Sequence, residues 1–168
     1  MNSRKICILG DFAVGKTSLV RRFVQQQFGD KYLTTVGVKV DTKTVTLHDG
    51  RALKLAIWDV AGTDTPTELF LRYARGAAGL LLVADVTRAE TLDCCRELWD
   101  AVSARLGPLP HVLLANKCDL AAQRELPRDA ADGLFGNALA RLDTSALTGE
   151  NVDLAFEALA RGLLDAAP

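Results

Sequence analysis

Residues 10–18 read GDFAVGKTS and match the pattern G-x-x-x-x-G-K-[ST] between an apolar run and a segment with helical spacing. Gly10 and Gly15 allow the backbone to turn its N–H groups inward around a chain of phosphates. A helix that begins near Lys16 adds the positive end of its dipole, and the Lys16 ammonium can reach the terminal phosphates. The motif therefore predicts a phosphate-binding loop, with the Thr17 hydroxyl available to Mg²⁺. The alternative is a glycine-bearing turn that matches by chance.

The chain has 168 residues, of which 49% are hydrophobic and 24% charged, and this predicts one compact domain over residues 1–168. Residues 1–84 hold 12 Lys+Arg against 7 Asp+Glu, although the whole chain has a net charge of -1. An anion suits this basic half. Because no Lys/Arg-rich run or interleaving of basic and aromatic residues is present, we expect no nucleic-acid partner.

No targeting signal is apparent. The longest mostly apolar stretch, residues 77–84, is far short of the roughly 20 residues that span a bilayer. The N-terminal residues MNSRKICILGD lack the plan of a secretory signal, and the last fifty residues contain no cysteine for prenylation. The four cysteines show no metal-binding spacing and are expected to be reduced thiols. We therefore expect a cytoplasmic protein with no membrane anchor in this chain.

Buried-strand patterns alternate with helical ones, which predicts an α/β fold with a parallel sheet. We expect strands at 5–9, 80–85, 112–116 and 140–143, and helices at 16–26, 91–106 and 151–164. Before the second of these strands, VKVDTKTVTLHDGRALKLAIWDVAG contains two alternating segments. They are joined by Asp49-Gly50, a dipeptide that suits a tight hairpin turn.

A second motif, Asn116-Lys117-Cys118-Asp119, follows the expected strand at 112–116. The Asp119 carboxylate can accept hydrogen bonds from the paired N–H groups of guanine, which adenine does not offer. Its position after a strand is the edge at which α/β sheets bind ligands, although a surface turn is an equally good account of four residues alone. Residues 144–146 (Thr-Ser-Ala) follow the last strand, and we expect their backbone N–H groups to meet the guanine carbonyl.

In order and spacing, GDFAVGKTS, YLTTVGV, WDVAGTD, NKCDL and TSA resemble the motifs of the Ras-like small GTPases, and most closely those of the Rab branch. The resemblance implies a P-loop NTPase fold: a six-stranded, mostly parallel sheet with one antiparallel strand and about five flanking helices. It implies binding of GTP or GDP with Mg²⁺, and two switch segments that change shape when the γ-phosphate is lost. The chain also resembles the Rab-like GTPases of bacteria.

The same resemblance assigns roles to residues outside the two motifs. Phe28 would lie against the guanine and Tyr32 would cover the phosphates, unless both are ordinary packing aromatics. Thr35 would ligate Mg²⁺ through its hydroxyl and meet the γ-phosphate through its N–H group. Asp59 would hold Mg²⁺ through water, and Gly62 would donate its N–H to the γ-phosphate.

Three sets of residues follow from the motifs and the resemblance. The metal set is Thr17, Thr35 and Asp59, and the catalytic set is Lys16, Thr35, Gly62 and Thr63. The nucleotide-binding set is Gly10, Ala13, Val14, Gly15, Lys16, Thr17, Ser18, Phe28, Tyr32, Thr35, Gly62, Asn116, Lys117, Asp119, Leu120, Ser145, Ala146 and Leu147.

Two departures from the family pattern concern hydrolysis. Thr63 stands where the family has a glutamine that orients the attacking water, and its hydroxyl reaches less far. Phe12 stands where the family has glycine or a small residue, because bulk there crowds the γ-phosphate and a partner's arginine finger. Ala13, where glycine is common, is a milder change. We expect a guanine-nucleotide switch that hydrolyses GTP slowly. The alternatives are a GTP-held binding module with negligible hydrolysis and, with a different base site, an ATP-using kinase.

The expected partners are an effector, an exchange factor and an activating protein, which would bind at the switch segments. Trp58 and Tyr73 keep two aromatic positions that Rab proteins present to effectors. Val40 replaces the phenylalanine expected as the third, and Lys39 replaces an acidic residue. We therefore expect an effector face with a similar location and different chemistry.

The remaining basic side chains suggest no catalytic group. His48 and His111 are expected to be surface or loop histidines. Arg72 and Arg75 are either internal arginine fingers or, as we expect, solvated residues of a helix face. A monomer is the expected oligomeric state.

Overall fold

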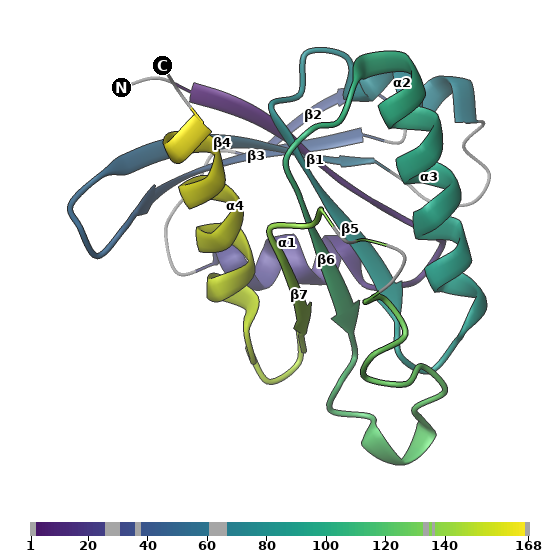
Figure 1. Ribbon diagram of the computed structural model, residues 1–168. Helices are drawn as coiled ribbons and strands as arrows, with labels where there is room; N and C mark the ends of the chain where they lie inside the picture. Colours follow the sequence, from purple (N-terminus) through teal and green to yellow (C-terminus); the bar gives the residue numbers. More distant parts are fainter. Residues whose placement is uncertain are drawn as a thin grey trace.

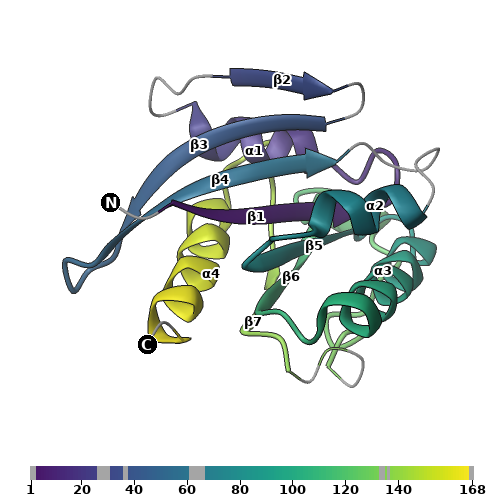
Figure 2. The ribbon, with the colours of Figure 1, turned by 90° about the horizontal axis from the view of Figure 1, so that it is seen from above.

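The computed structural model describes residues 3–25, 31–35, 38–60, 67–132, 135 and 137–166, with the backbone alone described at 31–35 and 67. These residues form one sheet with the strand order β2-β3-β4-β1-β5-β6-β7 (Figures 1 and 2). In chain order the elements are β1 (Ser3–Gly10), α1 (Lys16–Val24), β2 (Lys31–Thr35), β3 (Val38–Thr46), β4 (Ala52–Val60), α2 (Thr67–Ala74), β5 (Gly79–Asp85), α3 (Glu90–Leu106), β6 (His111–Asn116), a 3-10 helix (Ala121–Gln123), β7 (Ala140–Asp143) and α4 (Val152–Ala166).

The expected mostly parallel α/β sheet is confirmed. Strands β4, β1, β5, β6 and β7 run parallel to one another, and β3 pairs with β4 in the antiparallel direction. The structure adds to the expected six strands a short seventh strand, β2, which pairs antiparallel to β3 at the edge. Among the described residues, four α-helices and the 3-10 helix accompany the sheet, which agrees with the expected number of about five helices.

The predicted hairpin is β3 and β4, which pair from Val38 opposite Val60 to Thr46 opposite Ala52. Gly50 lies in the connecting turn with φ +90°, a conformation that glycine adopts without strain. The Leu47 N–H donates to the Arg51 carbonyl at 2.7 Å and closes this turn. Of the Asp49-Gly50 pair, Gly50 is therefore the residue that adopts the positive φ angle of the tight turn.

Helices cover both faces of the sheet. Figure 2 shows α1 and α4 on one side, with α2 and α3 on the other. Strand β5 is buried along its whole length because both layers cover it, which explains its continuous apolar sequence. Phe23 of α1 stacks on Phe156 of α4 with ring centroids 3.8 Å apart and nearly parallel planes. This stack joins the two helices of one layer.

His111 was expected at the surface, and this expectation is wrong. His111 begins β6 and is 2% exposed, because its ring packs against Trp99 of α3 with centroids 3.9 Å apart and planes tilted by 31°. Its Nδ1 atom lies 3.0 Å from the Leu109 carbonyl oxygen. His48 is exposed beside the hairpin turn, as expected, and Arg72 and Arg75 are exposed at the end of α2.

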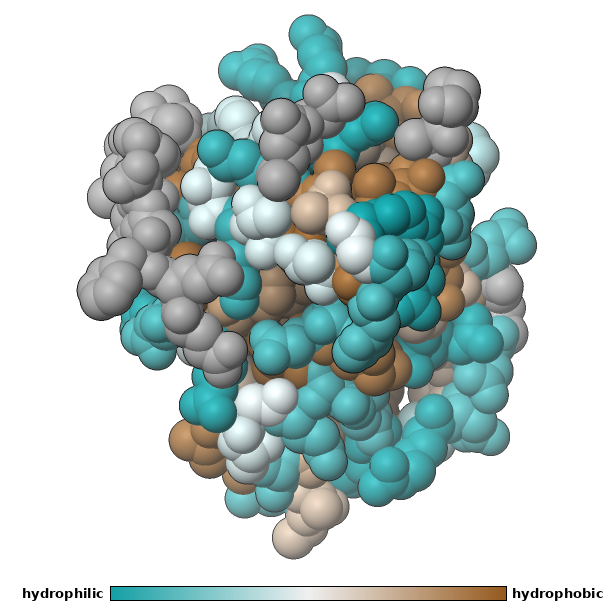
Figure 3. Space-filling model, turned by 90° about the vertical axis from the view of Figure 1, so that its left-hand side faces the viewer, coloured by the Kyte–Doolittle hydropathy of each residue, from teal (hydrophilic) through white to brown (hydrophobic). Residues whose placement is uncertain are grey.

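One face of the molecule is mixed in character. On the face in Figure 3, hydrophilic side chains interleave with smaller hydrophobic areas. Of the helices in the described ranges, none combines the length and apolar character that a bilayer span requires.

Candidate functional site

The carbonyl oxygens of the loop between β1 and α1 are bound by side chains. Each of the five carbonyls from Gly10 to Val14 accepts a hydrogen bond from a side chain, and four side chains make these bonds. The bonds are Lys16 Nζ to Gly10 O (2.9 Å) and Asp11 O (3.2 Å), Arg88 Nη2 to Phe12 O (2.7 Å), Lys117 Nζ to Ala13 O (2.8 Å) and Asn116 Nδ2 to Val14 O (2.9 Å).

A planar trans peptide directs its N–H group opposite to its carbonyl. Because the Phe12, Ala13 and Val14 carbonyls face Arg88, Lys117 and Asn116, the N–H groups of the same three peptides point away from those side chains. Gly15 is the N-cap of α1 and contributes no side-chain cap, so the first N–H groups of the helix extend this set of donors. The arrangement is a concave row of donors suited to an anion.

The two glycines of the motif are required by close contacts. A Cβ on Gly10 would overlap the Val83 carbonyl oxygen of β5. A Cβ on Gly15 would overlap the Asn116 amide, and Gly15 has φ +102°. Side chains at either position would displace the loop from the side chains that hold it.

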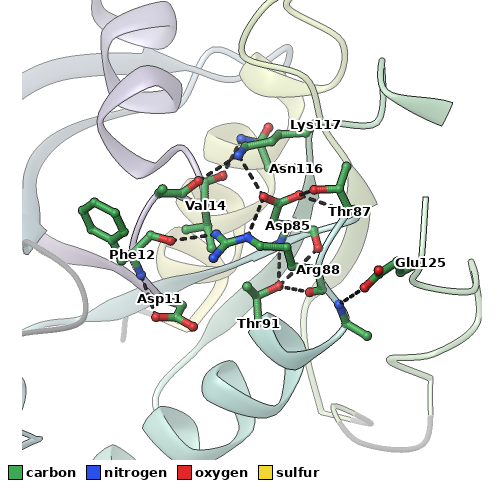
Figure 4. A network of polar contacts seen from close by, with 12 residues as sticks. Asp11, Phe12, Val14, Asp85, Thr87, Arg88, Thr91, Asn116, Lys117 and Glu125 are labelled. Atoms are coloured by element: carbon green, nitrogen blue, oxygen red, sulfur yellow. Dashed lines mark hydrogen bonds and ion pairs between the residues drawn. The ribbon is translucent and has the colours of Figure 1, made fainter. Parts of the chain in front are cut away.

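Asp85, at the end of β5, links two of the loop-binding cations (Figure 4). Its Oδ2 atom lies 2.8 Å from Lys117 Nζ and 3.2 Å from Arg88 Nε, and its Oδ1 atom accepts from the N–H and hydroxyl groups of Thr87. Burial alone would raise the pKa of Asp85, but the bonds from Lys117, Thr87 and Arg88 outweigh it and lower the pKa. Asp85 is therefore a carboxylate that positions both cations.

Lys16, Thr17 and Asp59 meet beside the loop. The Thr17 hydroxyl donates to Asp59 Oδ2 at 2.6 Å. Burial lowers the pKa of the Lys16 ammonium, and Asp59 opposes this shift. Burial raises the pKa of Asp59, whereas the Thr17 hydroxyl and Lys16 lower it. A hydroxyl and a carboxylate side by side are oxygen ligands of the kind that Mg²⁺ prefers, so these residues fit a magnesium ion.

A cavity of about 570 Å³ extends from the loop to the ends of β6 and β7. Its lining residues are Gly15, Ser18, Arg21, Arg22, Gln25, Asn116, Lys117, Asp119, Leu120, Ala146 and Leu147. The volume lies within the range that small-molecule sites occupy. The cavity thus brings the phosphate-loop motif and the Asp119 motif, about 100 residues apart, into one site.

The Asp119 end of the cavity is polar at its base and apolar at its sides. The Ser145 hydroxyl donates to Asp119 Oδ1 at 2.7 Å and fixes one carboxylate oxygen. Leu120 and Leu147 are both exposed, and Leu147 is 76% exposed. A flat ring with two N–H donors on one edge suits this combination of a carboxylate and apolar side chains.

The expectation for residues 144–146 needs correction. The Thr144 N–H donates to the Ala115 carbonyl at 2.9 Å, and the Ser145 N–H donates to the Glu150 carbonyl at 3.1 Å. These two groups are therefore already engaged in joining the loop to β6 and to the start of α4. Ala146, which lines the cavity, is left as the residue whose N–H suits a ligand carbonyl.

Other predicted residues are described in part or not at all. Phe28, Gly62 and Thr63 lie outside the described residues. Tyr32 and Thr35 lie in β2, where the backbone alone is described, so their proposed side-chain roles stay predictions.

Sequence reasoning missed Asp85 and Arg88. Asp85 carried a signal, because a carboxylate that ends an otherwise apolar buried strand lies at the ligand-binding edge of a parallel sheet. Arg88 carried none, since its partner is a backbone carbonyl 76 residues away along the chain.

The model of the Ras family matches residues 5–165 of this chain. Ras-related protein Rab-13 from Rattus norvegicus is 35% identical over 162 residues, which are 95% of this chain and 79% of that protein. Ras-related protein Rab-25 from Bos taurus and from Homo sapiens is 40% identical over 159 residues, 91% of this chain and 72% of each relative. With these matches, the chain belongs to the Rab branch of the Ras family, whose members are small GTPases that bind GTP and GDP.

Proposed function

We propose that this chain is a switch that binds GTP or GDP with Mg²⁺, hydrolyses GTP slowly and changes its partner contacts through two switch segments. The continuity of one cavity from Gly15 and Ser18 to Asp119 carries the proposal. A nucleotide there would place its phosphates at the N–H groups of the loop and its guanine at Asp119. The Asp119 carboxylate would accept from the two N–H groups of the guanine edge, and Leu147 would cover one side of the ring.

The phosphate end of the site supports charge stabilisation. The Lys16 ammonium is held at the start of the loop by the Gly10 and Asp11 carbonyls, and the residue is buried. Preorganised N–H groups and a buried cation stabilise charge that develops on phosphate oxygens without reorganising. Thr17 and Asp59, joined at 2.6 Å, would hold Mg²⁺, which supplies positive charge for the phosphates when bound.

For the hydrolytic step, we propose that the Thr35 and Gly62 backbone, with the Thr63 hydroxyl, orients the attacking water. The short reach of Thr63 supports a slow rate, because the water is held less firmly than by a glutamine. The partners would be an effector, an exchange factor and an activating protein at the switch segments. We also propose a monomer that acts in the cytoplasm, where free thiols such as those of Cys94 and Cys118 persist.

Phe12 favours a second candidate, a GTP-held binding module. Its side chain is 64% exposed on the phosphate loop, and its ring points away from the polar network in Figure 4. A large apolar side chain at this place would obstruct an arginine finger, which is commonly worth about 10³–10⁵ in rate. Such a protein would keep GTP intact and recruit its partner continuously.

Single-turnover hydrolysis separates the two candidates. The protein is loaded with GTP, Mg²⁺ is added, and the bound nucleotide is followed by chromatography. Appearance of GDP within hours supports the slow switch, whereas persistent GTP supports the binding module. The double variant Phe12→Gly with Thr63→Gln is expected to accelerate turnover in either case.

Base recognition is tested separately with Asp119→Asn. An amide presents a donor as well as an acceptor, so the variant is expected to lose guanine nucleotides and gain xanthine nucleotides. Unchanged preference for guanine in this variant would refute the assignment of Asp119.

A further inference from the structure

Arg88 binds the phosphate loop from outside the motifs of the family. It lies in the turn between β5 and α3, and its guanidinium reaches two groups at once (Figure 4). Nε lies 3.2 Å from Asp85 Oδ2, and Nη2 donates to the Phe12 carbonyl at 2.7 Å. The side chain is one-third exposed, whereas the Asp85 side chain is buried.

We propose that Arg88 is a positioning residue for phosphate binding: it holds the peptide between Phe12 and Ala13 so that the Ala13 N–H faces the nucleotide. This inference rests on the proposed function. The peptide is planar and trans, so anchoring the Phe12 carbonyl on the outside directs the Ala13 N–H to the inside of the loop. A charged donor on the carbonyl also polarises the peptide and strengthens its N–H as a donor.

The backbone at Ala13 needs this support. Ala13 has φ +59°, a left-handed conformation that is unfavourable for a residue with a side chain. The carbonyl before it is bound by Arg88, and its own carbonyl is bound by Lys117. Both cations also contact the same oxygen of Asp85. Arg88 and Lys117 are thus fixed relative to each other, and together they hold the backbone on both sides of Ala13.

The alternative is that the Arg88 side chain only stabilises the turn before α3. The turn has other bonds that do not need this side chain. Thr87 donates its N–H and hydroxyl to Asp85, and the Thr91 hydroxyl donates to the Arg88 carbonyl at 2.7 Å. Removing the guanidinium should therefore leave the turn and α3 in place and release the loop.

The test compares Arg88→Gln and Arg88→Lys with wild type and with Arg96→Gln. Arg96 is a matched control because it lies on α3, pairs with Asp100 at 3.2 Å and is similarly exposed. Dissociation of GDP is measured with Mg²⁺ present, and the phosphorus NMR spectrum of bound GDP is recorded for each protein. A change in the phosphate resonances reports a change in how the loop contacts the bound phosphates. A general loss of stability would not produce such a change.

We expect Arg88→Gln to release GDP about tenfold faster, at the lower end of what a charge-assisted hydrogen bond is worth, because the site is partly exposed. Its β-phosphate resonance is expected to shift. Arg88→Lys should fall between Arg88→Gln and wild type, since one ammonium cannot span both Asp85 and Phe12. Arg96→Gln should match wild type in both measurements.

An Arg88→Gln protein with wild-type GDP release and an unmoved β-phosphate resonance would overturn the inference. So would equal effects in Arg96→Gln, because the change would then belong to α3 as a whole. The proposed function fails in a different way. If wild type itself binds no guanine nucleotide, both proposals fall, whereas failure of the Arg88 inference alone leaves wild-type binding intact.

Discussion

The Ser145 hydroxyl donates a 2.7 Å hydrogen bond to one carboxylate oxygen of Asp119, although the two residues lie in different loops. Ser145 is completely buried, and its oxygen also accepts from the Thr148 N–H at 3.1 Å. The loop after β7 therefore determines how the Asp119 carboxylate is turned. If Asp119 binds the guanine as proposed, its orientation is set by a residue that need not touch the base.

Substitution Ser145→Ala should weaken guanine binding about fivefold, since a hydrogen bond of this kind contributes roughly 1 kcal/mol net. The freed carboxylate should also discriminate less between guanine and hypoxanthine, which lacks the exocyclic amine. Competition between GDP and inosine diphosphate measures both effects. Ser103→Ala is the control, because the Ser103 hydroxyl bonds the Trp99 carbonyl within α3. An unchanged ratio of the two affinities would show that Ser145 does not orient Asp119.

Acid should destabilise the protein through His111. Burial lowers the pKa of His111 below its ordinary value of 6.5, and its Nε2 atom has no hydrogen-bond partner among the described residues. The unfolded chain therefore binds this proton at a higher pH than the folded chain does. The stability contributed by the neutral ring is present above about pH 6.5 and is lost as the pH falls toward the folded pKa.

The measurement is the free energy of unfolding in urea between about pH 7.5 and 5.5, within which a histidine titrates. His111→Phe, which can keep the stack on Trp99, should flatten the pH dependence. His48→Gln, at an exposed position beside the hairpin turn, is the control for removal of a histidine. Equal slopes in wild type and His111→Phe would contradict the assignment.

The stack between Phe23 and Phe156 should be a main contributor to stability, because both rings are at most 3% exposed. Phe156→Ala should cost about 3–5 kcal/mol, the usual loss for a buried phenylalanine. Phe156→Leu keeps most of the volume and loses the ring contact, so it should cost about 1–2 kcal/mol. Urea unfolding at one fixed GDP concentration checks both values, since bound nucleotide adds to apparent stability. A loss below about 1 kcal/mol for the alanine variant would mean that neighbouring side chains move in to fill the space left by the ring.

Lys5 should hold the end of α2 against the sheet. Its ammonium lies 3.8 Å from the centroid of the Trp58 ring and donates to the Arg75 carbonyl at 2.8 Å. Lys5→Met removes both contacts and should increase hydrogen exchange in the peptide that covers residues 67–76. The global loss should be about 0.5–1 kcal/mol, the value of an exposed cation–π contact.

Lys54→Met is the matched control, because Lys54 is an exposed lysine on the neighbouring strand β4. Lys5→Arg should retain most of the protection, since a guanidinium also binds an aromatic face. Exchange that stays at the wild-type level in Lys5→Met would show that packing alone retains the helix end.

Much of the fold was predictable because local patterns and tertiary contacts agree. The apolar run that ends at Asp85 could be predicted as a buried strand, since helices cover both faces of β5. The hairpin at Gly50 was predictable from turn chemistry. His111 was misjudged because it follows a proline-bearing loop, whereas stacking on Trp99 buries it. The sequence around His111 does not indicate which residues pack against it in the folded protein, so its burial could not be predicted.

The candidate site divides in the same way. Gly15, Lys16 and Asp119 were predictable because each belongs to a short motif with a chemical reason for its spacing. The engagement of the Thr144 and Ser145 N–H groups was not, because it depends on how the loop after β7 returns to β6 and α4. Arg88 was not predictable for the same reason.

The four side chains that hold the phosphate loop come from α1, the turn before α3 and the end of β6. A ribosome completes residues 10–18 early, yet Asn116 and Lys117 emerge about 100 residues later. During synthesis, the growing chain therefore contains the glycine-rich motif long before it contains the later side chains that bind the carbonyls of the loop. We expect nucleotide capture to become possible after β5 has paired with β1 and β6 with β5, so a chain that holds its nucleotide has already assembled the centre of its sheet.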